Sequence, residues 1–134
     1  MIVVLDASGA AEIAAKTQKG VDIINTIMAA EKVLAPELYI SEISNMMWKL
    51  GRKDKSNADV YMEMAADCID YIDEYMSAAE LWKEALRMAQ DQDHPVYDML
   101  YAALAKRHGA LFITMDEKLR KICAKIPMNC KTFT

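Results

Sequence analysis

The chain has 134 residues, 54% of them hydrophobic, and a formal net charge of −4. This length predicts one domain, spanning residues 1–134, with a core large enough to fold without disulfides or a structural metal. Three cysteines without paired spacing argue against a disulfide framework and against a zinc site. The N-terminal apolar run of five residues is too short for a signal peptide or a membrane span. We therefore expect a cytoplasmic protein without a membrane segment.

The charges are distributed unevenly along the chain. Between residues 57 and 98 there are eleven acids and two bases, whereas from residue 105 to the end there are seven bases and two acids. The overall acidity excludes a uniformly basic nucleic-acid binder. A basic patch on one face remains compatible with this distribution.

In chain order, the first half of the sequence alternates apolar runs with amphipathic segments. Residues 2–5 form a continuous apolar run that suits a buried parallel strand, and residues 33–35 predict a weaker strand. Helices are predicted over 10–16 and 21–31, with a break near Gly20, and then over 36–50 and 57–71. The helix over 36–50 has a proline at its start and a glycine just past its end, as helices often do.

The second half continues the alternation. A short strand is predicted near 71–76 and a helix over 78–89, whose apolar stripe includes Trp82. A helix between Pro95 and Gly109, a strand over 110–114, a helix over 117–125 and a strand over 129–133 follow. This order predicts an α/β domain with a parallel sheet.

Asp98 is the only charged residue in the apolar run over residues 96–105. Because this run is apolar nearly all round, it predicts a largely buried helix that carries one lone carboxylate. A buried carboxylate is costly unless another group compensates its charge. We expect a metal ion to do so, since three further acids can be placed beside Asp98.

Asp6 and Asp116 each follow the carboxyl end of a predicted strand, where ligands of open α/β sheets bind. Glu42 lies with Tyr39 and Met46 on or beside the inward face of its helix. Four converging carboxylates repel each other by about 4 kcal/mol for each pair near 4 Å at an effective dielectric of 20. Ligands that are all oxygen suit Mg²⁺ or Mn²⁺, and phosphoryl transfer is the chemistry that uses such sites.

Four segments carry a resemblance to a known family. They read VVLDAS at 3–8, APELYISEISN at 35–45, HPVYDMLYAALAKRHG at 94–109 and LFITMDEKL at 111–119. In this order and at these spacings they resemble the PIN domain, and most of all the VapC-type toxins of bacterial and archaeal toxin–antitoxin pairs. The resemblance extends over the whole chain and implies an α/β domain of three layers, with a parallel sheet flanked by helices.

The resemblance implies a metal-dependent endoribonuclease that uses Mg²⁺ or Mn²⁺ to hydrolyse RNA phosphodiester bonds. It also implies a homodimer that a small antitoxin protein inhibits. By position, the acids that match the family's catalytic and metal-binding residues are Asp6, Glu42, Asp98 and Asp116. Ser8, Asn45 and Thr114 match residues that hydrogen-bond around them. Arg120 stands where some relatives carry a further acid, which argues against a second tightly held metal.

Other interpretations of these residues remain open. Asp6 and Asp116 also suit the position that caps a helix, and Glu42 would be exposed if its helix were rotated. The chain can also be a PIN-like module that binds RNA or protein without catalysis. A phospho-accepting receiver domain fits less well, because such a domain needs an acidic pair after its first strand and Ala7 follows Asp6 here.

Trp48 shares a helix face with polar residues, away from the apolar stripe. If exposed, it suits a dimer contact or a platform for base stacking; the alternative is burial against a neighbouring helix. Basic residues that follow it can contact phosphates, namely Lys49, Arg52, Lys53 and Lys55. An acidic helix face, formed by Asp59, Glu63, Asp67 and Asp70, is either solvated or contacts a basic partner.

Overall fold

The computed structural model describes residues 1–131 and 133 of the chain. Within these residues, five parallel strands form one sheet in the order β3-β2-β1-β4-β5. The strands are β1 (Ile2–Leu5), β2 (Lys32–Pro36), β3 (Glu74–Met76), β4 (Leu111–Ile113) and β5 (Asn129–Lys131). The predicted parallel sheet is therefore confirmed.

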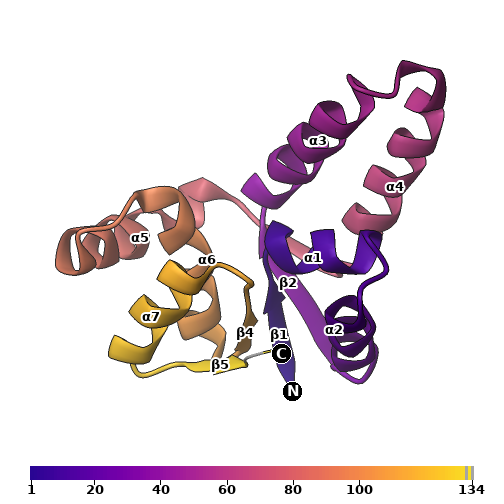
Figure 1. Ribbon diagram of the computed structural model, residues 1–134. Coiled ribbons are helices and arrows are strands. Elements are labelled where there is room, and N and C mark those ends of the chain that lie inside the picture. Colours follow the sequence, from indigo (N-terminus) through magenta and orange to yellow (C-terminus); the bar gives the residue numbers. More distant parts are fainter. Residues whose placement is uncertain (132, 134) are drawn as a thin grey trace.

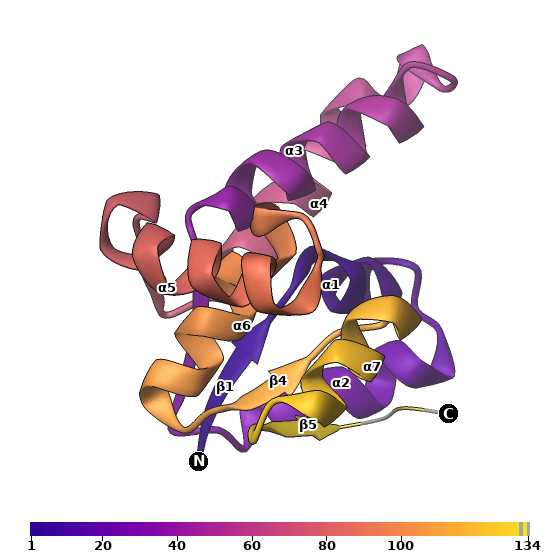
Figure 2. The ribbon, with the colours of Figure 1, turned by 90° about the vertical axis from the view of Figure 1, so that its left-hand side faces the viewer.

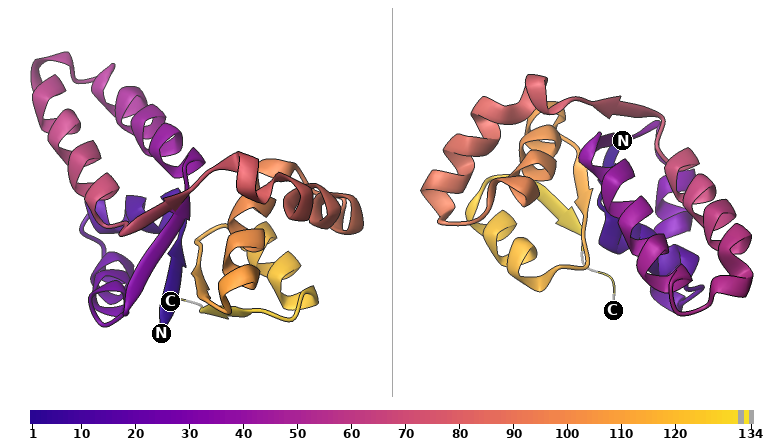
Figure 3. Two further views of the ribbon diagram at one scale, coloured as in Figure 1. Left: turned by 180° about the vertical axis from the view of Figure 1, so that it is seen from behind. Right: turned by 90° about the horizontal axis from the view of Figure 1, so that it is seen from above.

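Helices cover both faces of the sheet (Figure 1). They are α1 (Ala7–Ala14), α2 (Gln18–Met28), α3 (Leu38–Gly51), α4 (Ala58–Asp70), α5 (Ala78–Gln92), α6 (Val96–His108) and α7 (Glu117–Lys125). The first four lie on one side and the last three on the other, which confirms the three-layer prediction (Figures 1 and 3). Of the helices in the described part of the chain, none has the length and apolar character that crossing a bilayer requires.

β1 is the central strand and pairs on both sides, with Val3 opposite Val33 of β2 and opposite Leu111 of β4. Val3, Val4 and Leu5 are fully buried, as expected for a parallel strand covered on both faces. The chain runs outward from β1 through β2 to β3, and later from β4 to β5 on the other side. The strand order therefore reverses between β1 and β4, and ligands of such sheets bind beyond the carboxyl ends of the strands at that point.

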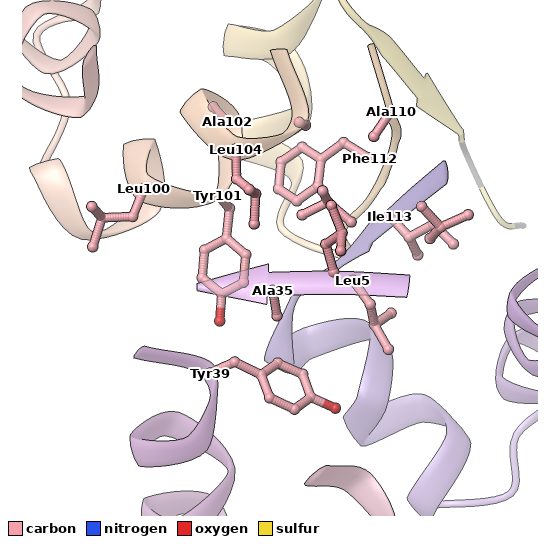
Figure 4. Packing of buried hydrophobic residues seen from close by; sticks show 14 of the residues in the cluster. Leu5, Ala35, Tyr39, Leu100, Tyr101, Ala102, Leu104, Ala110, Phe112 and Ile113 are labelled. Atoms are coloured by element: carbon pink, nitrogen blue, oxygen red, sulfur yellow. The ribbon is translucent and has the colours of Figure 1, made fainter. Parts of the chain in front are cut away.

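α6 is the helix most deeply embedded in the molecule, with Met99–Ala105 all buried. It ends at Gly109, whose φ of 58° lies in the left-handed region that glycine adopts without strain. Figure 4 shows α6 packed over the sheet, with the Tyr101 ring close to Phe112 of β4. These two rings stack with their centroids 6.2 Å apart and their planes 15° from parallel. The boundaries predicted from Pro95 and Gly109 are confirmed.

α3 and α4 form a hairpin that projects from the body of the molecule (Figures 1 and 2). At its base the Tyr39 hydroxyl of α3 donates a hydrogen bond to the Cys68 carbonyl of α4, at 2.6 Å. Towards its tip Trp48 is 58% exposed, with the Arg52 guanidinium 4.9 Å from its ring centroid. Burial of Trp48, one of the two alternatives, is thereby excluded. The acidic face of α4 is exposed to solvent, as are the four basic residues after residue 48.

Several predicted boundaries are wrong for identifiable reasons. The first helix begins at Ala7 rather than residue 10, because the Asp6 side chain caps it by accepting from the Gly9 amide. Gly20 lies inside α2 instead of breaking the helix. Pro36 ends β2 rather than beginning α3.

Further differences concern the second half of the chain. α5 runs three residues beyond the predicted end at 89, and Trp82 is half exposed, so it does not belong to the buried stripe of that helix. The last strand ends at Lys131, and residue 132 of the predicted 129–133 lies outside the described residues.

Replacing Gly20 with alanine is expected to destabilise the fold. An added Cβ would lie 2.1 Å from the Glu12 carbonyl oxygen and 2.9 Å from the Ile13 Cα, both in the backbone of α1. Overpacking of this kind costs on the order of 1–3 kcal/mol, because backbone has to move. The free energy of unfolding in urea would measure the loss.

Gly51→Ala serves as the control, since Gly51 also lies in a helix. There the added Cβ would lie 3.5 Å from the Tyr61 ring, an ordinary contact, and alanine favours helix by about 1 kcal/mol. Equal losses in the two variants would show that the close approach of α1 and α2 is not what requires Gly20.

Candidate active site

Asp6 is the buried acid of the site, with 6% of its surface exposed. It follows β1 and caps α1, so its Oδ1 accepts from the Ser8 hydroxyl at 2.5 Å and from the Gly9 amide at 3.1 Å. Burial raises the pKa of Asp6 above the ordinary carboxyl range, although hydrogen bonds from Ser8, Thr114 and the backbone oppose this shift. The capping role and a site role therefore coexist in one side chain.

Ser8 and Thr114 connect the ends of β1 and β4 around Asp6. Their hydroxyl oxygens are 3.4 Å apart, and Thr114 is fully buried. The Ser8 hydroxyl accepts from the Met115 amide at 2.8 Å, while the Thr114 hydroxyl accepts from the Asp116 amide at 3.1 Å. In addition, the Asp6 amide donates to the Ile113 carbonyl at 3.1 Å. These hydrogen bonds hold the loop after β4 against Asp6.

Glu42 lies in α3 and is half-buried. Its Oε1 accepts a hydrogen bond from the Tyr101 hydroxyl of α6 at 2.5 Å. Burial raises the pKa of Glu42, the Tyr101 hydrogen bond opposes the rise, and the negative charges of Asp6 and Asp98 add to it. Three of the four predicted acids therefore share one electrostatic environment.

Asp98 differs from its prediction as a lone buried carboxylate. Its side chain is 34% exposed, and its Oδ2 lies 2.7 Å from Nε2 of His94, whose side chain is only 7% exposed. Asp98 belongs to the first turn of α6, before the fully buried part of that helix begins at Met99. The expectation of a buried acid without a protein partner is therefore wrong for Asp98. Asp6 is the acid with that degree of burial.

Asp116 and Asn45 lie at the edge of this group and both are exposed. The Asp116 carboxylate caps α7 by accepting from the Leu119 amide at 3.0 Å. Asn45 lies about one helical turn after Glu42, and both line a groove of about 610 Å³ between α1, α3 and α4, together with Ser8. The groove is otherwise largely apolar, with alanines from α1 and methionines from α3 and α4.

The donor set of these acids suits a divalent cation. Among residues 1–131 and 133, no three acidic, histidine or cysteine side chains stand close enough together to enclose a metal ion as they lie. Carboxylate oxygens are nevertheless the ligands that Mg²⁺ and Mn²⁺ prefer. A cation among Asp6, Glu42 and Asp98 would offset both the burial of the first and the mutual repulsion of all three. The residues present therefore fit such an ion.

Two residues that contact the acids were not predicted as part of the site. Tyr101 lies in the apolar run that was predicted to form a buried helix, and His94 directly precedes the proline at which that helix was predicted to begin. Tyr101 follows Asp98 by three positions within α6, a spacing that places both side chains on one helix face, whereas His94 lies just before the helix begins. A tyrosine in an otherwise apolar run is also a signal, because a buried phenol requires a hydrogen-bond partner.

Comparison with known proteins identifies the family and the fold. The family model described as PIN domain matches residues 3–125. Ribonuclease VapC3 of Pyrobaculum aerophilum is 26% identical over 121 residues, which cover 89% of this chain and 92% of that protein.

Solved structures share the fold. PAE2754 from Pyrobaculum aerophilum superimposes with a TM-score of 0.73 at 23% identity, covering 91% of this chain and 84% of that one. VapBC2 from Rickettsia felis, bound to a DNA fragment from its promoter, gives 0.71 at 13% identity with full coverage of both chains. A toxin–antitoxin complex from Klebsiella pneumoniae gives 0.65 at 14% identity, covering 97% and 96%.

The raised pKa values of Asp6 and Glu42 predict how the stability of the metal-free protein depends on pH. Above the ordinary carboxyl pKa values of 3.8 and 4.5, the unfolded chain ionises both groups freely, whereas the folded protein ionises them at a cost. That cost disappears as the pH falls through the raised values, so these two groups favour the folded state at lower pH. We expect the Tm in EDTA to rise as the pH falls from neutral towards the raised values, and thermal melts over that range would measure the effect.

Asp6→Asn isolates the contribution of the buried acid. This variant keeps an oxygen to accept from Gly9, so it is expected to melt higher than the wild type near neutral pH and to vary less with pH. Asp67→Asn, an exposed position on α4, is expected to follow the wild type. A lower Tm of Asp6→Asn at neutral pH would contradict the assignment of Asp6 as a costly buried charge.

Proposed function

We propose that this chain, which belongs to the PIN domain family, is a divalent-metal-dependent endoribonuclease acting on RNA phosphodiester bonds. We further propose that residues 1–134 form one such catalytic domain. The observation that carries the proposal is the buried Asp6 carboxylate at the switch point of the sheet, whose negative charge acts together with that of Asp98 on Glu42. The similarity to a ribonuclease of Pyrobaculum aerophilum supports RNA as the substrate.

The proposed roles follow from the contacts of each residue. Asp6, Glu42 and Asp98, with Asp116 at the edge, would hold Mg²⁺ or Mn²⁺, which lowers the pKa of a bound water and neutralises charge on the phosphodiester. Ser8 and Thr114 fix the orientation of Asp6, and His94 fixes that of Asp98. Glu42 binds the cation or orients the attacking water, and Asn45 supplies a polar group beside it in the groove.

We propose an antitoxin and a second copy of the chain as protein partners. The structures from Rickettsia felis and Klebsiella pneumoniae, a VapBC2 and a toxin–antitoxin complex, support a toxin role. The projecting hairpin also exposes large apolar side chains, namely Trp48, Leu50, Val60 and Met62. Exposed apolar surface that gathers on one element is typical of a protein interface. Light scattering of the purified chain, alone and with a small protein encoded beside it, tests both partners.

RNA cleavage by the purified protein tests the proposed function. We expect discrete cleavage of labelled total RNA in Mn²⁺ and none in EDTA. Asp6→Asn and Asp98→Asn are expected to lose more activity than the roughly 10–100-fold that outer partners of a metal ligand typically contribute. Asp67→Asn, whose side chain is exposed on α4, is the matched control and should cleave like the wild type. Full activity of Asp98→Asn would refute the assignment of the site.

One observation favours a second candidate, a PIN-like module that binds RNA or protein without catalysis. Asp98 and Asp116 each have a protein partner, His94 and the Leu119 amide, so acids at these positions also serve the fold. RNA that is retained but uncut in both Mg²⁺ and Mn²⁺ would support the binding module.

A further inference from the structure

We propose that Tyr101 is the positioning residue of Glu42, and that its hydroxyl holds this carboxylate in the site so that a divalent cation binds tightly. The inference rests on the proposed function, because it assigns Glu42 to the metal site. It concerns a residue that does not touch the substrate and acts only through the acid that it contacts.

The contact joins two helices that are distant in sequence. The Tyr101 hydroxyl of α6 donates to Oε1 of Glu42 in α3, across 59 positions of the chain. Tyr101 is only 1% exposed, so water does not compete for its hydroxyl. A phenol that is bonded to one carboxylate oxygen leaves the second oxygen and the remaining lone pairs of Glu42 free to bind a cation.

The Tyr101 ring is itself held in place by the core. It stacks on Phe112 of β4, at the 6.2 Å centroid separation given above, and belongs to the cluster that includes Leu5 and Leu104. In Figure 4 its hydroxyl points away from Phe112, towards the side of the core where Tyr39 of α3 lies. Because the ring cannot shift without disturbing close-packed neighbours, its hydroxyl is a fixed point for Glu42.

Glu42 needs such a fixed point because its neighbours repel it. The charges of Asp6 and Asp98 both disfavour an ionised carboxylate at this position. A glutamate has several rotatable bonds, and Glu42 is only half-buried, so without a restraint it would turn away towards solvent. α6 therefore contributes Asp98 directly and, one helical turn later, fixes the position of a second acid.

Tyr101→Phe removes only the hydroxyl and is the test variant. The metal is first removed from the folded protein with EDTA, and the protein is then titrated with Mn²⁺ in a calorimeter. We expect the affinity of Tyr101→Phe for Mn²⁺ to be about tenfold or more below that of the wild type, as is typical when a residue that holds a metal ligand is lost. The matched control is Tyr39→Phe. Tyr39 is a fully buried tyrosine of α3 whose hydroxyl bonds to the Cys68 carbonyl rather than to one of the acids. We expect this control to lose Tm, as Tyr101→Phe does, but to keep the wild-type affinity for Mn²⁺.

A double-variant cycle separates positioning from general damage to the fold. In a Glu42→Gln background, Tyr101→Phe is expected to cause little further loss of Mn²⁺ affinity, because its effect passes through the carboxylate. Equal losses in both backgrounds would overturn the inference. If Tyr101→Phe does not fold, Glu42→Asp replaces it, since the shorter side chain withdraws from the Tyr101 hydroxyl without altering the core. Wild-type affinity for Mn²⁺ in that variant would also overturn the inference.

The outcomes distinguish this inference from the proposed function. Mn²⁺ binding by the wild type, with unchanged affinity in Tyr101→Phe, would overturn the positioning role and leave the proposed ribonuclease intact. A wild-type protein that binds no Mn²⁺ would overturn both. Reduced affinity in Tyr101→Phe alone, with Tyr39→Phe unaffected, is the expected result.

Discussion

The burial of the Asp6 carboxylate is the constraint on which the rest of the site depends. β1 pairs with strands on both sides, so the residue that follows it is fixed between the ends of β1 and β4. The hydroxyls of Ser8 and Thr114 and the Gly9 amide surround it, yet its pKa stays raised because these hydrogen bonds do not replace the lost hydration. Burial of the ionised Asp6 therefore lowers the stability of the folded protein, and a bound cation would offset this loss.

α6 shows that core packing and site geometry are parts of one arrangement. The same helix that buries its length against the sheet presents Asp98 at its first turn and Tyr101 one turn later. The stacking of Tyr101 on Phe112 therefore orders Glu42 as well as filling space. In a close-packed interior, changes in this part of the core are transmitted to the acids rather than absorbed.

Much of the architecture could be predicted from local patterns. The apolar run of β1, the boundaries of α6 and the alternation of strands and helices required only short-range rules, and Asp6 was placed at the sheet edge by the same logic. Contacts between distant segments could not be predicted, such as Tyr101 with Glu42. Periodicity defines which face of a helix turns inward but not how deep each turn lies, so the exposure of Asp98 and Trp82 differed from expectation. Gly20 was taken for a break because its packing role depends on α1.

The projecting hairpin has a mechanical consequence. α3 is continuous from Glu42 near its base to Gly51, a distance of about 14 Å at the rise of an α-helix. Asp6 is fixed in the sheet, whereas Glu42 belongs to a rod whose far end stands clear of the body (Figure 2). Any rotation of that rod about its base changes the separation between the two carboxylates. A partner that bound only the tip of the hairpin and tilted α3 would therefore move Glu42 relative to Asp6 without contact with either carboxylate.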